Sequence, residues 1–294
     1  MRYLNDTSKQ ELTQHFERTE RDFSNARPVS DEAFNVMKEL YKYEKEELNT
    51  QLIETIDSED WIKETIIVDV PYEDSPMQIL VYLPKKSKPP YQTVIYYPHD
   101  GPLDSNSLDD MVLEGEEFLI KSGRAFLWPV YYSNFGRGDI EIDNVFTWRQ
   151  TQIYRVIDFQ ITCDYLQTRD DIDLERIGYY GVSWGGMMAP FICAIEERIK
   201  LGILVLFGVQ GGEEYQELDQ INYLPRVTIP MLLMDGRYDF DFTLKQQQAF
   251  YDFLGTPEID KEWKLYETTH HIPRNDGVNE SLKWLDKYFG PVNY

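Results

Sequence analysis

The chain has 294 residues, of which 42% are hydrophobic and 28% are charged. This composition can build a sizeable core and excludes wholesale disorder, and the length suits one large domain or two small ones. The 52 acidic and 29 basic residues give a formal net charge of −23. Because so acidic a surface repels phosphate backbones and anionic lipids, the sequence disfavours nucleic acids and membrane surfaces as partners.

Two further features bear on the cellular compartment. The first twenty residues contain no apolar stretch of the kind found in signal peptides. The two cysteines, Cys163 and Cys193, lie in segments expected to be helical, which is typical neither of a disulfide framework nor of a metal-ligand cluster. We therefore expect a cytoplasmic protein.

Residues 1–60 are expected to form an N-terminal helical arm. Ser30 is a suitable N-cap, because acidic side chains follow it in the first turn. Apolar residues then recur at helical spacing, namely Phe34, Met37, Tyr41 and Leu48.

From Trp61 onward the apolar pattern becomes strand-like. Strands are expected at 64–72, 77–84, 92–98, 125–132, 176–183, 201–209, 230–236 and 263–268. Helices are expected at 107–122, 145–168, 184–198, 243–254 and 278–289. The later strands are nearly continuous apolar runs, as in a parallel sheet covered on both faces. Residues 61–294 therefore predict one α/β domain with an eight-stranded, mostly parallel sheet and helices on both faces.

The segment Gly181-Val182-Ser183-Trp184-Gly185 carries the strongest chemical signal. It matches G-x-S-x-G, and it lies between a predicted strand and a predicted helix, which is the setting that a nucleophilic serine requires. The two glycines remove side chains that would clash across so tight a turn. Ser183 is therefore the candidate nucleophile, although the same pattern also occurs as an ordinary glycine-rich turn.

A serine nucleophile needs a base, which is most often histidine. The chain has four histidines: His15, His99, His270 and His271. In this class of enzyme the chain order is serine, acid and then histidine, so the base is expected after the last strand. One of the adjacent pair His270 and His271 is then the base, and the other is a neighbour that shapes the pocket.

The acid is expected after the penultimate strand, where the chain offers Asp235, Asp239 and Asp241. Asp235 comes while the chain is still strand-like. Asp239 follows Gly236 by three residues, on a loop that can curl back toward the histidine. Asp241 has an alternative role as a cap of the next helix. This argument favours Asp239.

Two backbone N–H groups are needed to bind an oxyanion. One should belong to Trp184, directly after the nucleophile. The other should come from the loop after the third strand, where we favour Asp100, with Gly101 as the alternative. Since a carboxylate beside a developing negative charge would raise the barrier, the Asp100 side chain must point away.

Aromatic and imidazole side chains near the expected strand ends are candidates for substrate binding. They are His99, Tyr131, Tyr132, Trp184 and His271. Aromatic residues at strand ends are more often ordinary packing. No metal or organic cofactor is implied.

From Trp61 to the C-terminus the chain resembles the α/β-hydrolase superfamily. The segments IDLERIGYYGVSWGG, NYLPRVTIPMLLMDGRYDFDF, ETTHHIPRND and LDKYFGPV resemble bacterial acetyl-xylan-esterase/dienelactone-hydrolase-like domains, which are often fused to serine/threonine kinases. No kinase signature occurs in this chain. The resemblance implies an α/β-hydrolase fold and places the nucleophile, acid and base at Ser183, Asp239 and His270.

The chain departs from that family at two points. Thr269 stands where glycine usually precedes the histidine, and Pro98-His99-Asp100 stands where the oxyanion loop usually reads P-G-S. The second departure bears on catalytic efficiency and substrate choice.

These observations predict a serine hydrolase acting on small carboxylic esters through an acyl-enzyme. The stretch 210–229 is too short for a large cap domain, so any cover over the site must come from the arm or from residues 132–144. Short acyl groups are therefore expected. A prolyl-oligopeptidase-like peptidase and a non-catalytic binding or signalling module are the alternatives. The oligomeric state stays open.

Overall fold

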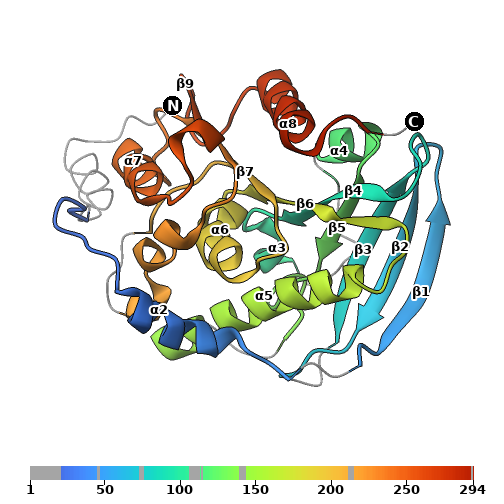
Figure 1. Ribbon diagram of the computed structural model, residues 1–294, viewed down its shortest axis with the longest axis horizontal. Coiled ribbons are helices and arrows are strands. Elements are labelled where there is room, and N and C mark those ends of the chain that lie inside the picture. Colours follow the sequence, from blue (N-terminus) through green and yellow to red (C-terminus); the bar gives the residue numbers. More distant parts are fainter. Residues whose placement is uncertain are drawn as a thin grey trace, which may run out of the picture.

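The computed structural model describes residues 21–44, 47–72, 76–105, 113, 115–138, 144–210, 215–292 and 294. One nine-stranded sheet runs through it in the order β1-β2-β3-β5-β4-β6-β7-β8-β9 (Figure 1). The strands are β1 Thr50–Asp57, β2 Trp61–Val68, β3 Met77–Pro84, β4 Tyr91–Tyr97, β5 Ala125–Pro129, β6 Ile172–Val182, β7 Leu201–Val205, β8 Met231–Gly236 and β9 Lys261–Tyr266. This is the α/β architecture that the sequence predicts.

The helices cover both faces of this sheet. They are α2 Asp31–Lys38, α3 Gly101–Asp104, α4 Glu117–Lys121, α5 Val145–Leu166, α6 Trp184–Ile195, α7 Leu244–Phe253 and α8 Arg274–Phe289. Short 3-10 helices are η1 Glu39–Tyr41, η3 Gln216–Leu218, η4 Gln220–Asn222, η5 Leu224–Arg226 and η6 Glu258–Asp260. The predicted helix at 107–122 lies partly outside the described residues, and α4 is its last part.

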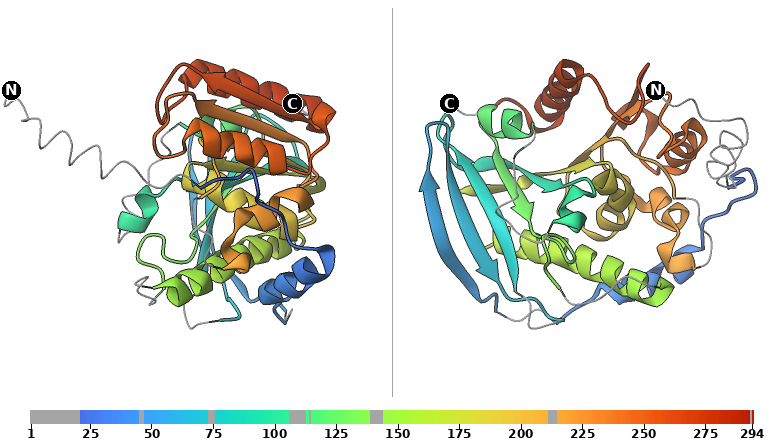
Figure 2. Two further views of the ribbon diagram at one scale, coloured as in Figure 1. Left: turned by 90° about the vertical axis from the view of Figure 1, so that its left-hand side faces the viewer. Right: turned by 180° about the vertical axis from the view of Figure 1, so that it is seen from behind.

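Alternation along the strands divides the interior into two cores. Successive side chains of a strand point to opposite faces. In β4, Ile95 and Tyr97 join the core beneath α2, α5, α6 and α7, whereas Val94 and Tyr96 join the core beneath α4 and α8. Figure 1 and the reverse view in Figure 2 show α5 and α8 on opposite sides of the sheet.

The first strand departs from the prediction. Residues Thr50–Asp57 form β1, which pairs antiparallel with β2, and all eight of its residues are exposed. The prediction of a helical arm through residue 60 is therefore wrong for residues 50–57. The sheet has nine strands instead of the predicted eight. Leu52 and Ile56 are four positions apart and look helical, but backbone pairing with β2 decides the conformation.

The helix predicted to begin after Ser30 is confirmed, whereas residues 1–20 of the predicted arm lie outside the described residues. Ser30 caps α2, accepting a hydrogen bond from the Ala33 N–H at 3.3 Å. The α2–η1 segment then packs against the domain, where the Tyr41 and Tyr223 hydroxyl groups are 2.8 Å apart.

The parallel strands bring their carboxyl ends to a common edge. Tyr97 at the end of β4 pairs with Gly181 of β6, and Gly236 at the end of β8 pairs with Tyr266 of β9. In parallel α/β sheets this edge is where ligands bind. Asp100, Ser183, Asp239 and His270 each follow one of these strand ends.

None of the helices in the described part of the chain combines the length and apolar content needed to cross a membrane.

Candidate active site

Ser183 occupies the turn that joins β6 to α6. Its φ of 51° and ψ of −101° lie outside the regions that a residue with a side chain ordinarily adopts, so this backbone is strained. A Cβ at Gly181 would lie 2.6 Å from the Gly185 oxygen, and one at Gly185 would lie 2.1 Å from the Tyr97 oxygen. Both positions therefore require glycine, which gives the sequence pattern its physical reason.

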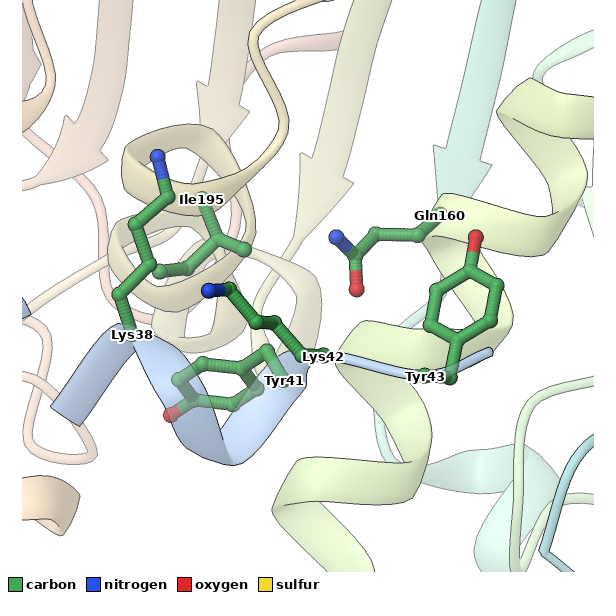
Figure 3. Close-up of a pocket in the computed structure, with 6 residues that line it drawn as sticks. All are labelled: Lys38, Tyr41, Lys42, Tyr43, Gln160 and Ile195. Atoms are coloured by element: carbon green, nitrogen blue, oxygen red, sulfur yellow. The ribbon is translucent and has the colours of Figure 1, made fainter. Parts of the chain in front are cut away.

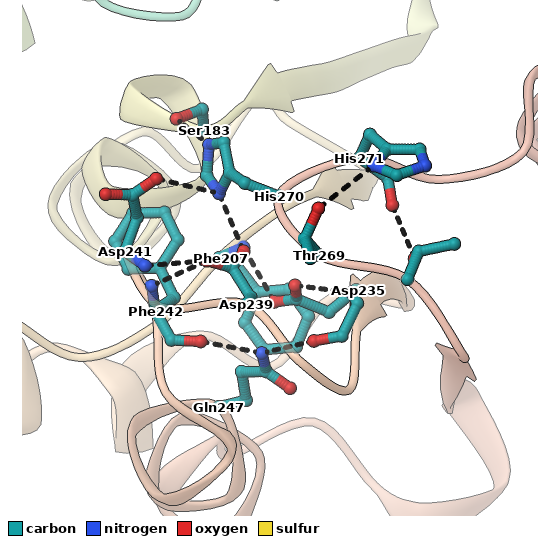
Figure 4. Close-up of polar contacts among 12 residues, drawn as sticks. Ser183, Phe207, Asp235, Asp239, Asp241, Phe242, Gln247, Thr269, His270 and His271 are labelled. Atoms are coloured by element: carbon teal, nitrogen blue, oxygen red, sulfur yellow. Dashed lines mark hydrogen bonds and ion pairs between the residues drawn. The ribbon is translucent and has the colours of Figure 1, made fainter. Parts of the chain in front are cut away.

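His270 lies between Ser183 and Asp239 (Figure 4). Its Nε2 is 2.9 Å from Ser183 Oγ, and its Nδ1 is 2.7 Å from Asp239 Oδ2. A carboxylate only accepts hydrogen bonds, so Nδ1 carries the proton and Nε2 is free to accept the serine hydroxyl proton. The loops after β6, β8 and β9 thus bring three distant residues into one hydrogen-bonded chain.

The Asp239 carboxylate is held by the loop that follows it. Its Oδ1 accepts the backbone N–H groups of Asp241 at 2.8 Å and Phe242 at 3.0 Å, and its side chain is fully buried. Asp241 itself reaches His270 Nδ1 only at 3.7 Å and is 61% exposed. The N-cap of α7 is Thr243, so the alternative role of Asp241 as a helix cap is wrong.

The environment shifts the pKa values of Asp239 and His270 in opposite directions. Burial raises the pKa of Asp239, but the hydrogen bond from His270 and the two backbone N–H groups outweigh it and lower that pKa below its ordinary value. Burial lowers the pKa of His270, yet the hydrogen bond and charge of Asp239, with the charges of Asp241 and Asp100, raise it overall. His270 is therefore a stronger base than a free imidazole.

The backbone N–H groups of Trp184 and Asp100 have no acceptor among the described residues. The neighbouring groups are already used, because the Gly185 N–H donates to Pro98 O at 3.0 Å and the Gly101 N–H donates to His99 Nδ1 at 2.9 Å. The Asp100 side chain is 75% exposed. Trp184 and Asp100 are therefore available as hydrogen-bond donors to an oxyanion. The N–H group of Gly101, the alternative donor, is already bonded to His99.

Among the described residues, no hydrogen bond or ring contact joins the predicted substrate-binding residues Tyr131, Tyr132 and His271 to Ser183. Tyr131 and Tyr132 are fully buried, and Tyr131 stacks on Tyr97 with ring centroids 4.0 Å apart. His271 is exposed and turns toward Thr269, whose hydroxyl oxygen is 3.3 Å from His271 Nδ1 (Figure 4). The plain packing role is the one observed for both tyrosines.

Two residues that lie beside the Trp184 ring were not predicted from the sequence. The Trp148 ring lies edge-on to the Trp184 ring at 5.2 Å, and the buried Arg155 guanidinium lies 5.1 Å from the centre of that ring. Trp148 and Arg155 are seven positions apart, so they share one face of α5. That spacing is readable in the sequence, but it does not reveal that this face meets α6.

Two carboxylates of the loop after β8 and one histidine of the loop after β9 are close enough together to be considered as metal ligands. Potential ligand atoms of Asp239, Asp241 and His270 lie within 4.8 Å of one another. Asp239 and His270 already satisfy each other through a hydrogen bond, however, and a metal on Nδ1 would displace it. We therefore interpret Asp239 and His270 as an acid–base pair and not as metal ligands.

A separate cavity of about 140 Å³ lies where η1 meets α5 and the end of α6 (Figure 3). Its lining residues are Lys38, Tyr41, Lys42, Tyr43, Gln160 and Ile195. Its two lysines are engaged in ion pairs, with Glu197 at 2.9 Å and with Glu39 at 2.7 Å. The cavity shares no residue with the Ser183 site, and we assign it no role.

No protein-family model matches the chain. Among curated proteins, it is 24% identical over 177 residues to "Putative hydrolase YtaP" of Bacillus subtilis, covering 52% of this chain and 56% of that protein. It is 22% identical over 263 residues to "Acylamino-acid-releasing enzyme" of Rattus norvegicus, covering 76% of this chain and 35% of the rat protein. The chain thus spans about half and about a third of these relatives.

Among solved structures, the chain is similar to the acetyl xylan esterase from Paenibacillus sp. R4. The TM-score is 0.70 with 16% sequence identity, over 94% of this chain and 99% of that one. At this identity the similarity establishes the fold, and the chain has the α/β-hydrolase fold that its motifs imply.

Proposed function

We propose that the protein is a serine hydrolase that cleaves carboxylic esters of small acyl groups. The observation that carries the proposal is the hydrogen-bonded chain from Ser183 through His270 to Asp239, with the serine held in a strained strand-to-helix turn. The fold and the similarity to a putative hydrolase support the same class of reaction.

In this mechanism Ser183 Oγ attacks the ester carbonyl carbon while His270 Nε2 takes the hydroxyl proton. Asp239 keeps Nδ1 protonated and stabilises the imidazolium that forms. The N–H groups of Trp184 and Asp100 stabilise the oxyanion. His270 then gives its proton to the leaving alcohol, and the acyl group stays on Ser183.

Water completes the cycle in a second half-reaction. His270 removes a proton from water, whose oxygen attacks the acyl carbon, and Ser183 regains its proton as the carboxylic acid leaves. The segment between β7 and β8 supports a small acyl group, because its described residues form three short 3-10 helices and no cap domain.

The test is hydrolysis of p-nitrophenyl acetate between pH 5 and 9. We expect Ser183→Ala to lower kcat by at least about 10³-fold, because the nucleophile is lost. Ser58→Ala, in the turn between β1 and β2, is the matched control and should keep full activity. An unchanged rate in Ser183→Ala would refute the assignment.

The adjacent histidines provide a second matched pair. His270→Ala should lose activity on a comparable scale, whereas His271→Ala should retain most of it, because only the His270 ring contacts Ser183. Wild-type activity should fall as the pH drops through the pKa of His270, which lies above the ordinary value of 6.5. Equal losses in the two variants would contradict the proposed base.

Similarity to an acylamino-acid-releasing enzyme makes peptide cleavage the second candidate. Acyl-amino-acid anilides tested beside the matching esters separate the two activities. A higher kcat/KM for the anilide would replace the esterase with a peptidase. Failure of an active-site phosphonate to label folded protein would instead favour a non-catalytic module.

A further inference from the structure

The acid loop, residues 237–242, joins β8 to α7 and carries Asp239. Its outer side faces solvent, since Tyr238 is 58% exposed. On the side of the base, the loop is held by backbone, because the Tyr238 N–H donates to Thr268 O at 2.9 Å, two residues before His270. On the side of α7, it is held by a side chain that the proposed mechanism does not use.

That side chain is Gln247, which lies in the first turn of α7 with none of its surface exposed. Its Nε2 donates to Phe242 O at 2.8 Å and to Gly236 O at 3.0 Å (Figure 4). Each of the two amide hydrogens therefore has its own acceptor. The two bonds join the residue that precedes the acid loop to the last residue of the loop.

The same two residues hold Asp239. The Gly236 carbonyl oxygen also accepts the Asp239 N–H at 3.2 Å, and the Phe242 N–H donates to Asp239 Oδ1 at 3.0 Å. Gln247 thus connects the group that fixes the Asp239 backbone to a group that fixes its carboxylate. The other carboxylate oxygen, Oδ2, is left to face His270 Nδ1 at 2.7 Å.

Packing alone would not favour an amide at this place. The Gln247 Oε1 is buried and has no hydrogen-bond partner within the described part of the chain. A buried polar atom without a partner costs free energy, whereas methionine is similar in length and carries no such atom. The amide contributes what methionine cannot, which is a pair of donors for two carbonyl oxygens.

We propose that Gln247 is a positioning residue, which holds the Asp239 carboxylate at hydrogen-bonding distance from His270 by joining the two ends of the acid loop. Gln247 does not contact the reacting atoms and acts through the loop. This inference rests on the proposed serine-hydrolase function. It predicts that Asp239 moves away from His270 when the two donors are removed.

Two adjacent glutamines on α7 provide a matched pair of variants. Gln247→Met removes both donors and keeps a similar length. Gln248→Met makes the same substitution at an exposed position, where the amide donates to Asp252 at 2.8 Å. With p-nitrophenyl acetate we expect Gln247→Met to lower kcat/KM roughly 10-fold to 100-fold, as when a group that orients a functional side chain is removed. Gln248→Met should match the wild type.

The pH profile distinguishes positioning from a loss of folded protein. Burial lowers the pKa of His270, but the hydrogen bond and charge of Asp239 outweigh burial and raise it. The charges of Asp241 and Asp100 add to the rise. If Asp239 moves away in Gln247→Met, this pKa falls and the acid limb of kcat/KM moves to lower pH. A smaller amount of folded enzyme would lower the rate at every pH without moving the limb.

Proton NMR tests the hydrogen bond without turnover. A proton held between an imidazole nitrogen and a carboxylate resonates downfield of the amide protons, so the wild type should show a signal that His270→Ala lacks. We expect Gln248→Met and Ser183→Ala to keep this signal, and Gln247→Met to shift it upfield or lose it. Because this measurement needs no catalysis, its failure is distinguishable from failure of the esterase proposal.

Wild-type kcat/KM with an unmoved acid limb in folded Gln247→Met would overturn the proposal, as would equal losses in Gln247→Met and Gln248→Met. An unchanged downfield signal in Gln247→Met, or none in the wild type, would also overturn it. If Gln247→Met does not fold, Gln247→Glu decides, because it keeps the length and, protonated in this buried place, one of the two donors. An intermediate loss with the limb at lower pH then supports the proposal, and wild-type kinetics overturn it.

Discussion

The antiparallel strands β1–β3 and the parallel strands β4 and β6–β9 are built differently and serve different purposes. Every residue of β1 is exposed, whereas every residue of β8 is buried. None of the candidate site residues lies in β1–β3. Asp100, Ser183, Asp239 and His270 follow β4, β6, β8 and β9, respectively.

The difference shows that the candidate catalytic residues lie at the ends of the parallel strands, whereas the antiparallel strands β1–β3 carry none of them. Covering a parallel sheet on both faces buries its strands, so the chain can turn sharply at their carboxyl ends without exposing the core. Those turns collect at one edge and carry the polar groups. The antiparallel strands β1–β3 extend the sheet, and their outer strand β1 is exposed to solvent. Four experiments test this division.

The largest effect is expected at the turn after β6. Gly185→Ala would place a Cβ 2.1 Å from the Tyr97 oxygen, so the backbone around Ser183 must shift. A displacement of about 1 Å in a reacting group can cost roughly 10²-fold in rate. We expect kcat/KM for p-nitrophenyl acetate to fall at least that far. Normal kinetics in a folded variant would show that the turn tolerates the shift.

The next effect concerns stability and compares the two kinds of strand directly. Leu233 in β8 is fully buried, and Leu233→Ala should lower the free energy of unfolding by about 2–5 kcal/mol through the cavity that it leaves. Ile56 in β1 is 44% exposed, so Ile56→Ala should cost well under about 2 kcal/mol. Urea denaturation measures both, and equal losses would break the comparison.

A smaller effect is expected on the pH profile. Asp241 lies 3.7 Å from His270 Nδ1, and its negative charge raises the pKa of His270. In Asp241→Asn that pKa should fall, because a negative charge that stabilises the imidazolium is removed. The acid limb of kcat/KM should therefore move to lower pH. Asp252→Asn makes the same charge change near the end of α7 and should leave the limb in place.

The smallest effect concerns substrate charge. Asp100 and Asp241 are 75% and 61% exposed beside the site, and they should repel an anionic acyl group. We expect a butyrate ester to be hydrolysed a few-fold faster than the monosuccinate ester of the same alcohol, with the preference shrinking at 1 M salt, where charges are screened beyond about 3 Å. Equal kcat/KM values at low salt would show that these carboxylates do not face the substrate.

Much of the parallel half could be predicted from the sequence, because its signals are local. Apolar runs locate the strands, and two glycines flanking Ser183 indicate a turn that only glycine permits. The order of serine, acid and histidine then restricts the choice to a few residues. Asp239 and His270 are the members of their groups that lie within hydrogen-bonding distance of each other.

The remaining features depend on contacts between distant segments. β1 is a strand because β2 pairs with it, although its apolar spacing looks helical. Tyr131 and Tyr132 end up in the core because α5 and β4 close over them.

The sequence by itself determined the α/β class, the turn at Ser183 and the short sets of acids and bases that could serve it, because periodicity and glycine placement act over a few residues. Only the tertiary structure decided which carboxylate meets His270 and which N–H groups near Ser183 have no acceptor among the described residues. Those outcomes depend on distances of about 3 Å between residues that are far apart in the chain.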